Sequence, residues 1–286
     1  MKLYDSRICR VVTLHRKEDA IRPSFESILG MKTIPFEINT DLLGTFSGEV
    51  ERKLTPKLCA KEKCLTALKM LPTESLSDCL IASEGTFGPH PHIPFAVSGF
   101  EILYFMDCKL DFELYISRIF PSTNFASAPF SDWVNIMETV PKWGFPTHAL
   151  IVRPNIWNHD LPIFKGIAHL TDLEKSFYTC RQLSSDSKVW IGTDMRAHKN
   201  PTRMETIATL AETLAHQLNC LCPSCNTPGW GIVRHVPGLP CSDCYQPTEL
   251  IHHIEYGCCK CAYLEKKPRK NGLTFAGPEH CPSCNP

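Results

Sequence analysis

The sequence predicts an α/β fold: a mixed-sheet body domain over residues 1–219, then a C-terminal tandem zinc-ribbon module over 220–286. Three observations support this prediction. Short β-branched apolar segments alternate with amphipathic helical segments through the body, which is typical of α/β folds. Residues 101–119 have the pattern of an antiparallel hairpin, so the sheet should be mixed. Finally, paired Cys-x-x-Cys motifs occupy the last 65 residues.

The body elements follow one another in a regular order. Residues 7–14 are rich in β-branched side chains and predict a buried strand, followed by a helix that ends near Leu29. A second helix should begin at Thr55-Pro56, where a capping hydroxyl precedes a proline. Its buried face is expected to carry Leu58, Leu65, Leu68 and Leu71. Further strands are predicted at 79–83, 101–107, 112–119, 148–153 and 189–193, and helices at 131–140 and 170–183.

The most regular helical pattern covers residues 201–218. Asn200 is a suitable N-cap and Pro201 a suitable first residue. One continuous apolar stripe contains Met204, Ile207, Ala208, Ala211, Leu214, Ala215 and Leu218. This pattern predicts a long helix that packs against the body.

Four Cys-x-x-Cys motifs predict two structural Zn²⁺ sites. Each motif presents two thiolates from one tight turn, and two motifs complete a tetrahedral shell. Neighbouring motifs are expected to pair, since the spacers within the two pairs are 15 and 19 residues, close to those of zinc ribbons. The predicted ligands are Cys222, Cys225, Cys241, Cys244, Cys258, Cys261, Cys281 and Cys284.

Disulfide bonding is the alternative interpretation of these cysteines. The chain opens without a basic stretch and apolar run of the kind that precedes a secreted domain. Its other cysteines are scattered at core-like positions, which indicates a reducing, cytoplasmic setting. Cys220 and Cys259 lie close enough in sequence to replace a ligand. The nearby histidines (His252, His253 and His280) are weaker candidates because four thiolates already fill each shell.

Composition favours an ordinary globular protein without a membrane segment. Hydrophobic residues make up 43% of the 286 and charged residues 21%. The longest apolar runs, such as 102–106, are far shorter than the ~20 residues of a membrane helix. The net charge is zero, and the tail carries 6 basic and 5 acidic residues. A general nucleic-acid clamp is therefore not favoured, and the basic stretch 266–270 is interpreted as a solvated loop.

Four polar clusters lie at predicted element ends within the body. They cover residues 15–18, 40–52, 82–92 and 193–203. The last cluster connects a strand to the N-terminus of the 201–218 helix, where free N–H groups and the helix dipole attract anions. Arg196, His198 and Arg203 would add donors for a phosphate or carboxylate. The alternative is a structural ion-pair network between Asp194 and the arginines.

The other clusters offer acid–base and metal-binding groups. Glu84 is expected in a glycine-containing loop that follows a strand, with His90 and His92 nearby. Together with Asp194 these groups would suit an additional divalent metal, although histidines in a proline-rich loop are often simply exposed. Glu49 would serve as a general base if burial raised its pKa, or would instead pair with Arg52 on a solvated face.

These strings also resemble a family of uncharacterised, mostly bacterial proteins that share a domain of unknown function. The resemblance rests on His15-x-Lys17-Glu18, Asp41-x-x-Gly44-Thr45-Phe46-x-Gly48-Glu49-x-x-Arg52, the segments 83–91, 123–125, 145–151, 165–167 and 193–203, and the tail Cys-Pro-x-Cys motifs. Arg16 departs from the pattern, which has a small residue there. The family has no established activity, so the resemblance implies a relative and not a function.

The leading functional hypothesis is an enzyme or small-molecule binder with a polar pocket built where the four clusters converge. Lys17, Arg52, His90, Arg196 and Arg203 would bind an anionic phosphorylated or carboxylated metabolite. Glu49, Glu84, Asp194 and His198 would supply the chemistry of a hydrolase or transferase. The alternatives are a nucleic-acid-associated ribbon protein and a zinc-stabilised interaction protein. The sequence predicts no oligomeric state.

Overall fold

The computed structural model describes residues 2–45, 47–76, 78–93, 95–121 and 123–286, so Phe46 of the second polar cluster lies outside the described residues. The chain forms two compact units. The first unit comprises Met1–Asp111 and Tyr115–Thr213, and the second Phe112–Leu114 and Leu214–Pro286. None of the described helices combines the length and the hydropathy that a membrane crossing needs.

A five-stranded mixed sheet forms the centre of the first unit. Its strand order is β2 (Lys32–Phe36), β1 (Ile8–Val12), β3 (Cys79–Pro89), β4 (Val97–Asp107) and β5 (Phe112–Phe120). Strand β1 runs parallel to β2 and β3, whereas β3 and β4 form an antiparallel hairpin. This confirms the predicted α/β class with a mixed sheet.

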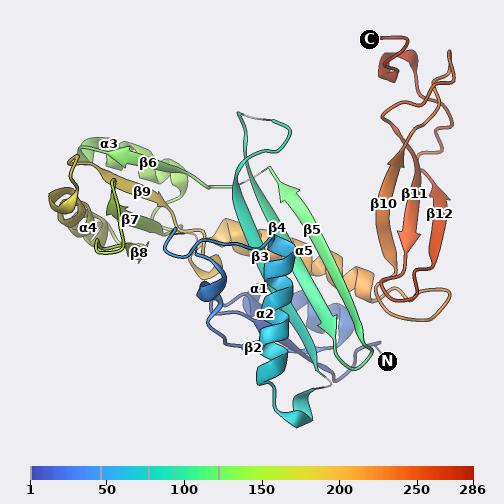
Figure 1. The fold of residues 1–286 in the computed structure, drawn as a ribbon, viewed down its shortest axis with the longest axis horizontal. Helices are drawn as coiled ribbons and strands as arrows, with labels where there is room; N and C mark the ends of the chain where they lie inside the picture. The colour runs from blue at the N-terminus through green and yellow to red at the C-terminus, as the bar shows by residue number, and fades with distance from the viewer. Residues whose placement is uncertain (1, 46, 77, 94, 122) are drawn as a thin grey trace. The chain divides into compact units, whose positions relative to one another are not determined.

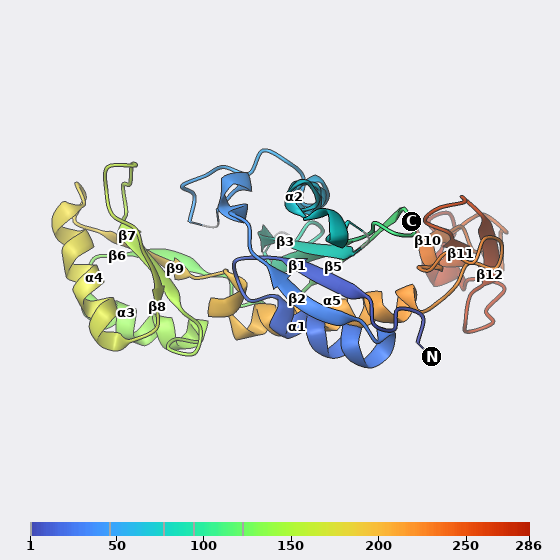
Figure 2. The same cartoon turned by 90° about the horizontal axis from the view of Figure 1, so that it is seen from below.

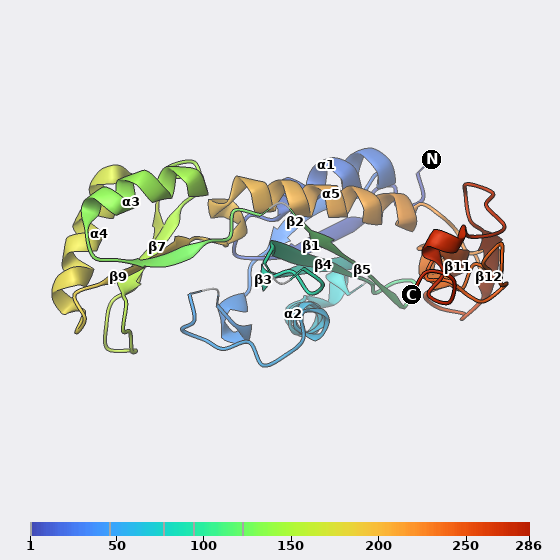
Figure 3. The same cartoon turned by 90° about the horizontal axis from the view of Figure 1, so that it is seen from above.

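Helices cover both faces of this sheet. α2 (Pro56–Met70) lies on one face, and α1 (Glu18–Ser24) lies on the other together with α5 (Pro201–Leu218) (Figures 2 and 3). Residues 25–29 continue α1 as a π-helical turn. The predicted buried face of α2 was wrong in part, because Leu58 is 49% exposed. The helix instead buries the small residues Ala60, Cys64 and Ala67, which allow it to pack closely on the sheet.

A second, antiparallel sheet in the first unit has the order β6 (Ser127–Phe130), β9 (Val189–Thr193), β7 (Leu150–Pro154) and β8 (Phe164–Ile167). Its helices are α3 (Trp133–Thr139) and α4 (Leu170–Leu183) (Figure 1). Phe177 and Ile136 are fully buried in the core that these helices share with the strands of the sheet. The bounds of α4, β9 and α5 match the prediction, whereas the four-residue strands β6 and β8 were missed because they are too short to show a period.

The second unit contains a three-stranded antiparallel sheet. Strands β10 (Gly231–Pro237), β11 (Ile251–Gly257) and β12 (Leu264–Pro268) follow one another in sequence and in space. Short helices complete the described structure, at Thr40–Leu43, Thr73–Ser75, Val140–Trp143, Ala197–Lys199 and Pro278–His280.

Candidate functional site: two cysteine clusters and a cationic cavity

Two groups of four cysteines in the second unit could each hold a metal ion. One group comprises Cys222, Cys225, Cys258 and Cys261, and the other comprises Cys241, Cys244, Cys281 and Cys284. The Sγ–Sγ distances between motifs are 3.8 and 3.6 Å in the first group and 3.9 and 3.5 Å in the second. Four sulfurs at ~2.3 Å from a central Zn²⁺ have tetrahedral edges of ~3.8 Å, whereas a disulfide needs ~2.05 Å. The sulfurs therefore fit metal sites and not disulfides.

The pairing of the motifs differs from the prediction. The first motif joins the third and the second joins the fourth, so the spacers are 32 and 36 residues and not 15 and 19. Strand topology explains the error. Because β10 and β11 are antiparallel, the motif before β10 meets the motif after β11. Because β12 reverses again, its end returns to the motif between β10 and β11. The two sites therefore lie at opposite ends of the sheet.

The motifs share a local backbone geometry. The residue after the second cysteine has a positive φ in three of them: Asn226 at 58°, Tyr245 at 60° and Ala262 at 58°. Amide groups donate to the sulfurs, as Ser224 N–H does to Cys222 Sγ at 3.4 Å. Cys259 is not a ligand in either group, and its Sγ lies 3.4 Å from the Pro228 carbonyl oxygen. Cys220 likewise lies outside both groups.

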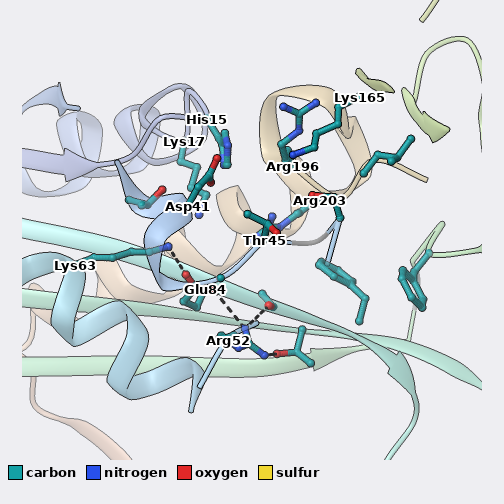
Figure 4. A pocket seen from close by; sticks show the side chains of 18 residues that line it. His15, Lys17, Asp41, Thr45, Arg52, Lys63, Glu84, Lys165, Arg196 and Arg203 are labelled. Atoms are coloured by element: carbon teal, nitrogen blue, oxygen red, sulfur yellow. Dashed lines mark hydrogen bonds and ion pairs between the residues drawn. The ribbon is translucent and has the colours of Figure 1, made fainter. Parts of the chain in front are cut away.

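The first unit contains a cavity of about 290 Å³ that gathers residues from all four polar clusters. Figure 4 shows the side chains around it. Its lining includes His15, Lys17, Asp41, Thr45, Arg52, Lys63, Glu84, Phe87, Phe125, Ile151, Lys165, Arg196 and Arg203. Six of these are lysines or arginines, and two are carboxylic acids. Segments that are up to 188 residues apart in sequence therefore meet in one place.

Glu84 is the carboxylate of the cavity wall that accepts hydrogen bonds from two of its basic residues. It accepts hydrogen bonds from Lys63 and, at 3.3 Å, from Arg52, which also donates to the Gly85 carbonyl at 2.9 Å and to Thr86 Oγ1 at 2.6 Å. Burial alone would raise its pKa, but Lys63 and Lys17 outweigh it and hold the pKa near 2. Glu84 lies within β3, which runs to Pro89, and not in the loop that the sequence predicted. It is ionised at neutral pH.

Lys17 is buried in the cavity wall at 5% exposure. Its Nζ donates to the Ser83 backbone carbonyl at 3.1 Å. Burial, Lys63 and Arg203 lower its pKa to about 7, against the opposing effect of Glu101 and Glu84. The ammonium is thus strongly desolvated.

Two arginines of the fourth cluster are held in ion pairs. Arg203 is buried and bonds Glu101 through Nε at 3.0 Å and Nη2 at 3.1 Å, while Nη1 donates to the Met195 carbonyl at 2.6 Å. Asp194 is fully buried and accepts from Arg196 Nε and Nη2 and from the Gly166 N–H at 3.0 Å. The alternative interpretation of this cluster, an ion-pair network, therefore describes the contacts of both arginines.

The N-terminus of α5 does not offer the free N–H groups that the sequence predicted for an anion. Asn200 caps it, since its Oδ1 accepts from the Arg203 N–H at 3.0 Å and its carbonyl from the Met204 N–H at 3.1 Å. The Thr202 N–H donates to His148 Nε2 at 3.3 Å, and Pro201 has no N–H. The predicted cap is confirmed, and the same contacts leave the end of the helix without free donors.

Glu49, His198 and His90 are not among the residues that line the cavity. Glu49 instead bonds Lys165, which does line it, and Ser47 Oγ at 2.7 Å. Burial would raise the Glu49 pKa, but these hydrogen bonds lower it. The raised pKa on which the general-base hypothesis depended is therefore not found. His198 stacks on His15 with ring centroids 5.1 Å apart, and burial and Arg196 lower its pKa.

A further divalent metal in the first unit gains no support from the described residues. Among them, groups of three or more metal-competent side chains occur at the two cysteine clusters alone. Glu84 and Asp194 are already ion-paired. His90 Nδ1 accepts from the His92 N–H at 3.1 Å.

Two cavity lysines were missed by the sequence interpretation. Lys63 lies on the buried face of α2 between Cys59 and Cys64, and a charge within such a face is a signal that something pairs with it. Lys165 belongs to a Lys-Gly-Ile string that the family resemblance includes, yet no chemistry was assigned to it. Its partner, Glu49, is 116 residues away.

No curated protein matches this chain. A family model described as a domain of unknown function (DUF6671) matches residues 63–286, a region that includes Lys63, Glu84, Arg196 and all eight clustered cysteines. Because the match covers well over half of the chain, the protein belongs to this family.

Proposed function

We propose that the cavity of the first unit binds a small anionic metabolite that carries a phosphate or carboxylate group. The observation that carries the proposal is the convergence of six basic side chains, from separate elements, on one cavity. Glu84 is shared by Lys63 and Arg52, and Lys17 has no carboxylate partner within the described residues. Even after Glu49, Asp194 and Glu101 are counted with Asp41 and Glu84, the basic groups outnumber the acidic ones by one.

Arg196 and Lys165 are the best-placed groups to bind the anion. The Arg196 guanidinium uses Nε and Nη2 on Asp194, which fixes its plane and leaves Nη1 without a partner in the described structure. Lys165 is partly exposed and can exchange Glu49 for a ligand, since its side chain is 25% exposed. In place of the catalytic role expected from the sequence, we assign Glu49 and Asp194 to the positioning of these two cations, and Glu84 to the positioning of Lys63 and Arg52.

The size of the cavity favours a metabolite over a polymer. About 290 Å³ is at the lower end of the range for small-molecule sites, which runs from ~300 to ~1,000 Å³. A phosphate with a few attached carbons fits such a volume. Nucleic acid would instead need an extended basic surface. The aromatic residues Phe87 and Phe125 and the aliphatic Ile151 supply the apolar part of the wall.

We also propose that Zn²⁺ is the metal of the cysteine clusters. Four thiolates at tetrahedral spacing select zinc or iron, and two structural zinc ions would stabilise the second unit as in zinc ribbons.

Calorimetric titration of the zinc-loaded chain with inorganic phosphate, ribose 5-phosphate and a short RNA tests the anion proposal. Lys165→Ala and Arg196→Lys should each weaken sugar-phosphate binding about tenfold, because each loses a charge-assisted hydrogen bond worth ~1.5 kcal/mol or more. Arg181→Ala, on the exposed side of α4, is the matched control. Sugar-phosphate binding that is equal in all variants would contradict the proposal. Binding of RNA alone would move the function to another surface.

A further inference from the structure

The three lysines of the cavity differ in their partners. Lys63 bonds Glu84, and Lys165 bonds Glu49. Lys17 is the exception, because its Nζ contacts the neutral carbonyl oxygen of Ser83 and no carboxylate within the described residues. A neutral amine makes the same contact with one N–H and keeps its lone pair for another atom. The site therefore accommodates Lys17 as an amine.

The charges around Lys17 favour the same form. Lys63 from α2 and Arg203 from α5 are the cationic neighbours, while Glu84 from β3 and Glu101 from β4 oppose them. His15, from the loop after β1, adds no charge, because burial and Lys17 lower its pKa to about 3. Burial has the largest effect, and together with Lys63 and Arg203 it lowers the pKa of Lys17 to about 7. Cationic neighbours and desolvation are the two means by which proteins activate a lysine as a nucleophile.

The loop that presents Lys17 is held rigidly. Arg16 adopts a φ of 53°, a left-handed conformation that costs a non-glycine residue free energy. His15 stacks on His198, and the Lys17 carbonyl accepts from the Ala20 and Ile21 N–H groups at 3.1 and 3.2 Å. Lys17 thus lies between a stacked histidine and the first turn of α1, to which its own carbonyl is bonded.

We propose that Lys17 is a nucleophile that forms an imine with an aldehyde or ketone group of the anionic ligand. The Lys17 nitrogen attacks the carbonyl carbon and gives a carbinolamine. Both N–H protons then leave with the carbonyl oxygen as water, and a C=N bond remains. The inference rests on the proposed anion binding, since Arg196 and Lys165 hold the charged end of the ligand. It narrows the substrate class to phosphorylated or carboxylated carbonyl compounds.

Reductive trapping tests the inference on the full, zinc-loaded chain. The protein is incubated at pH 7 with glycolaldehyde phosphate and sodium cyanoborohydride, and the secondary amines are located by peptide mass mapping. An exposed lysine with a pKa of ~10.4 is deprotonated about once in 2,500 molecules at pH 7, against about half for a pKa near 7. Lys17 should therefore react on the order of 10² to 10³ times faster than Lys175 on α4. At pH 9.5 the ratio should fall to about ten, because the Lys17 amine is already neutral while an ordinary exposed lysine continues to deprotonate.

Variants separate the inference from the proposed function. Lys17→Arg should abolish the fast label, and Lys175→Arg should leave it unchanged. Phosphate binding is measured in parallel by calorimetry. Equal labelling of Lys17 and Lys175 at pH 7 overturns the imine inference, and phosphate binding in that sample would leave the anion proposal standing. Fast labelling of Lys17 that excess phosphate does not slow supports the nucleophile but overturns anion binding. The label is mapped on the unsubstituted chain, so the result does not depend on whether a variant folds.

Discussion

The cysteine clusters and the cationic cavity both bring together side chains that are distant in sequence, but they do so in different ways. In each cluster, four ligands arrive as two pairs, and each pair is set by a single turn. In the cavity, each of the six basic side chains comes alone, from a different strand, helix or loop. The identity of a ligand that belongs to a local turn is visible in the sequence. The identity of its partner depends on tertiary structure in both regions.

The largest predicted effect tests the interleaved pairing of the cysteine motifs. Cys225→Ser with Cys258→Ser removes two ligands from one site, so one metal ion per chain should remain. Cys225→Ser with Cys244→Ser damages both sites, so no metal should remain. Each site supplies about 10 kcal/mol or more of binding free energy, which exceeds the stability of a small unit. Native mass spectrometry counts the ions directly.

The two double variants are matched controls, since each carries two conservative changes. Sequential pairing predicts the opposite result, with one ion retained by the Cys225/Cys244 variant and none by the Cys225/Cys258 variant. That outcome would restore the pairing expected from spacer length. Titration with cadmium in place of zinc gives a second count.

Particular residues show how far the sequence could predict this protein. The eight cysteine positions, Asn200 as a cap and the bounds of α5 follow from local rules, and the structure confirms them. Glu84 was placed in a loop because glycine interrupts its segment, but pairing with β4 continues β3 to Pro89. Tertiary register decided this case, and a single strand cannot reveal its register.

The candidate site was harder to predict because charge partners are distant in sequence. Arg203 pairs with Glu101 across 102 residues, and Lys165 with Glu49 across 116. The sequence indicated that the polar clusters could converge. The sequence could not distinguish a cation that is held in an ion pair by a buried carboxylate from a cation that can bind a ligand.

Arg203 and Lys165 make that distinction testable. Arg203→Met leaves Glu101 buried and unpaired, which should destabilise the first unit by about 3–5 kcal/mol. Lys165→Ala breaks a partly exposed pair and should cost less than about 1 kcal/mol, while it weakens anion binding. Urea unfolding followed by tryptophan fluorescence reports on the first unit, where Trp133, Trp143, Trp157 and Trp190 lie.

The double variant Arg203→Met with Glu101→Gln is the control for the first of these changes. Removal of both charges should recover a large part of the lost stability, because no ion is left unpaired. If Arg203→Met lowered the free energy of unfolding as little as Lys165→Ala, Arg203 would not be a structural cation. It would then be interpreted again as a ligand-binding residue.

The last prediction concerns the backbone of the cysteine motifs. Ala262 follows the third motif with a φ of 58°, where its Cβ meets the following carbonyl oxygen. Ala262→Gly removes this contact and should stabilise the second unit by about 1 kcal/mol, or about fivefold in hydrogen-exchange protection of β11 and β12. Ala276→Gly is the matched control, because Ala276 is buried and has no positive φ. There glycine adds flexibility to the unfolded chain without relieving strain, so the same exchange measurement should show a loss of protection. A loss at both positions would mean that metal ligation, and not the backbone conformation at Ala262, sets the local stability.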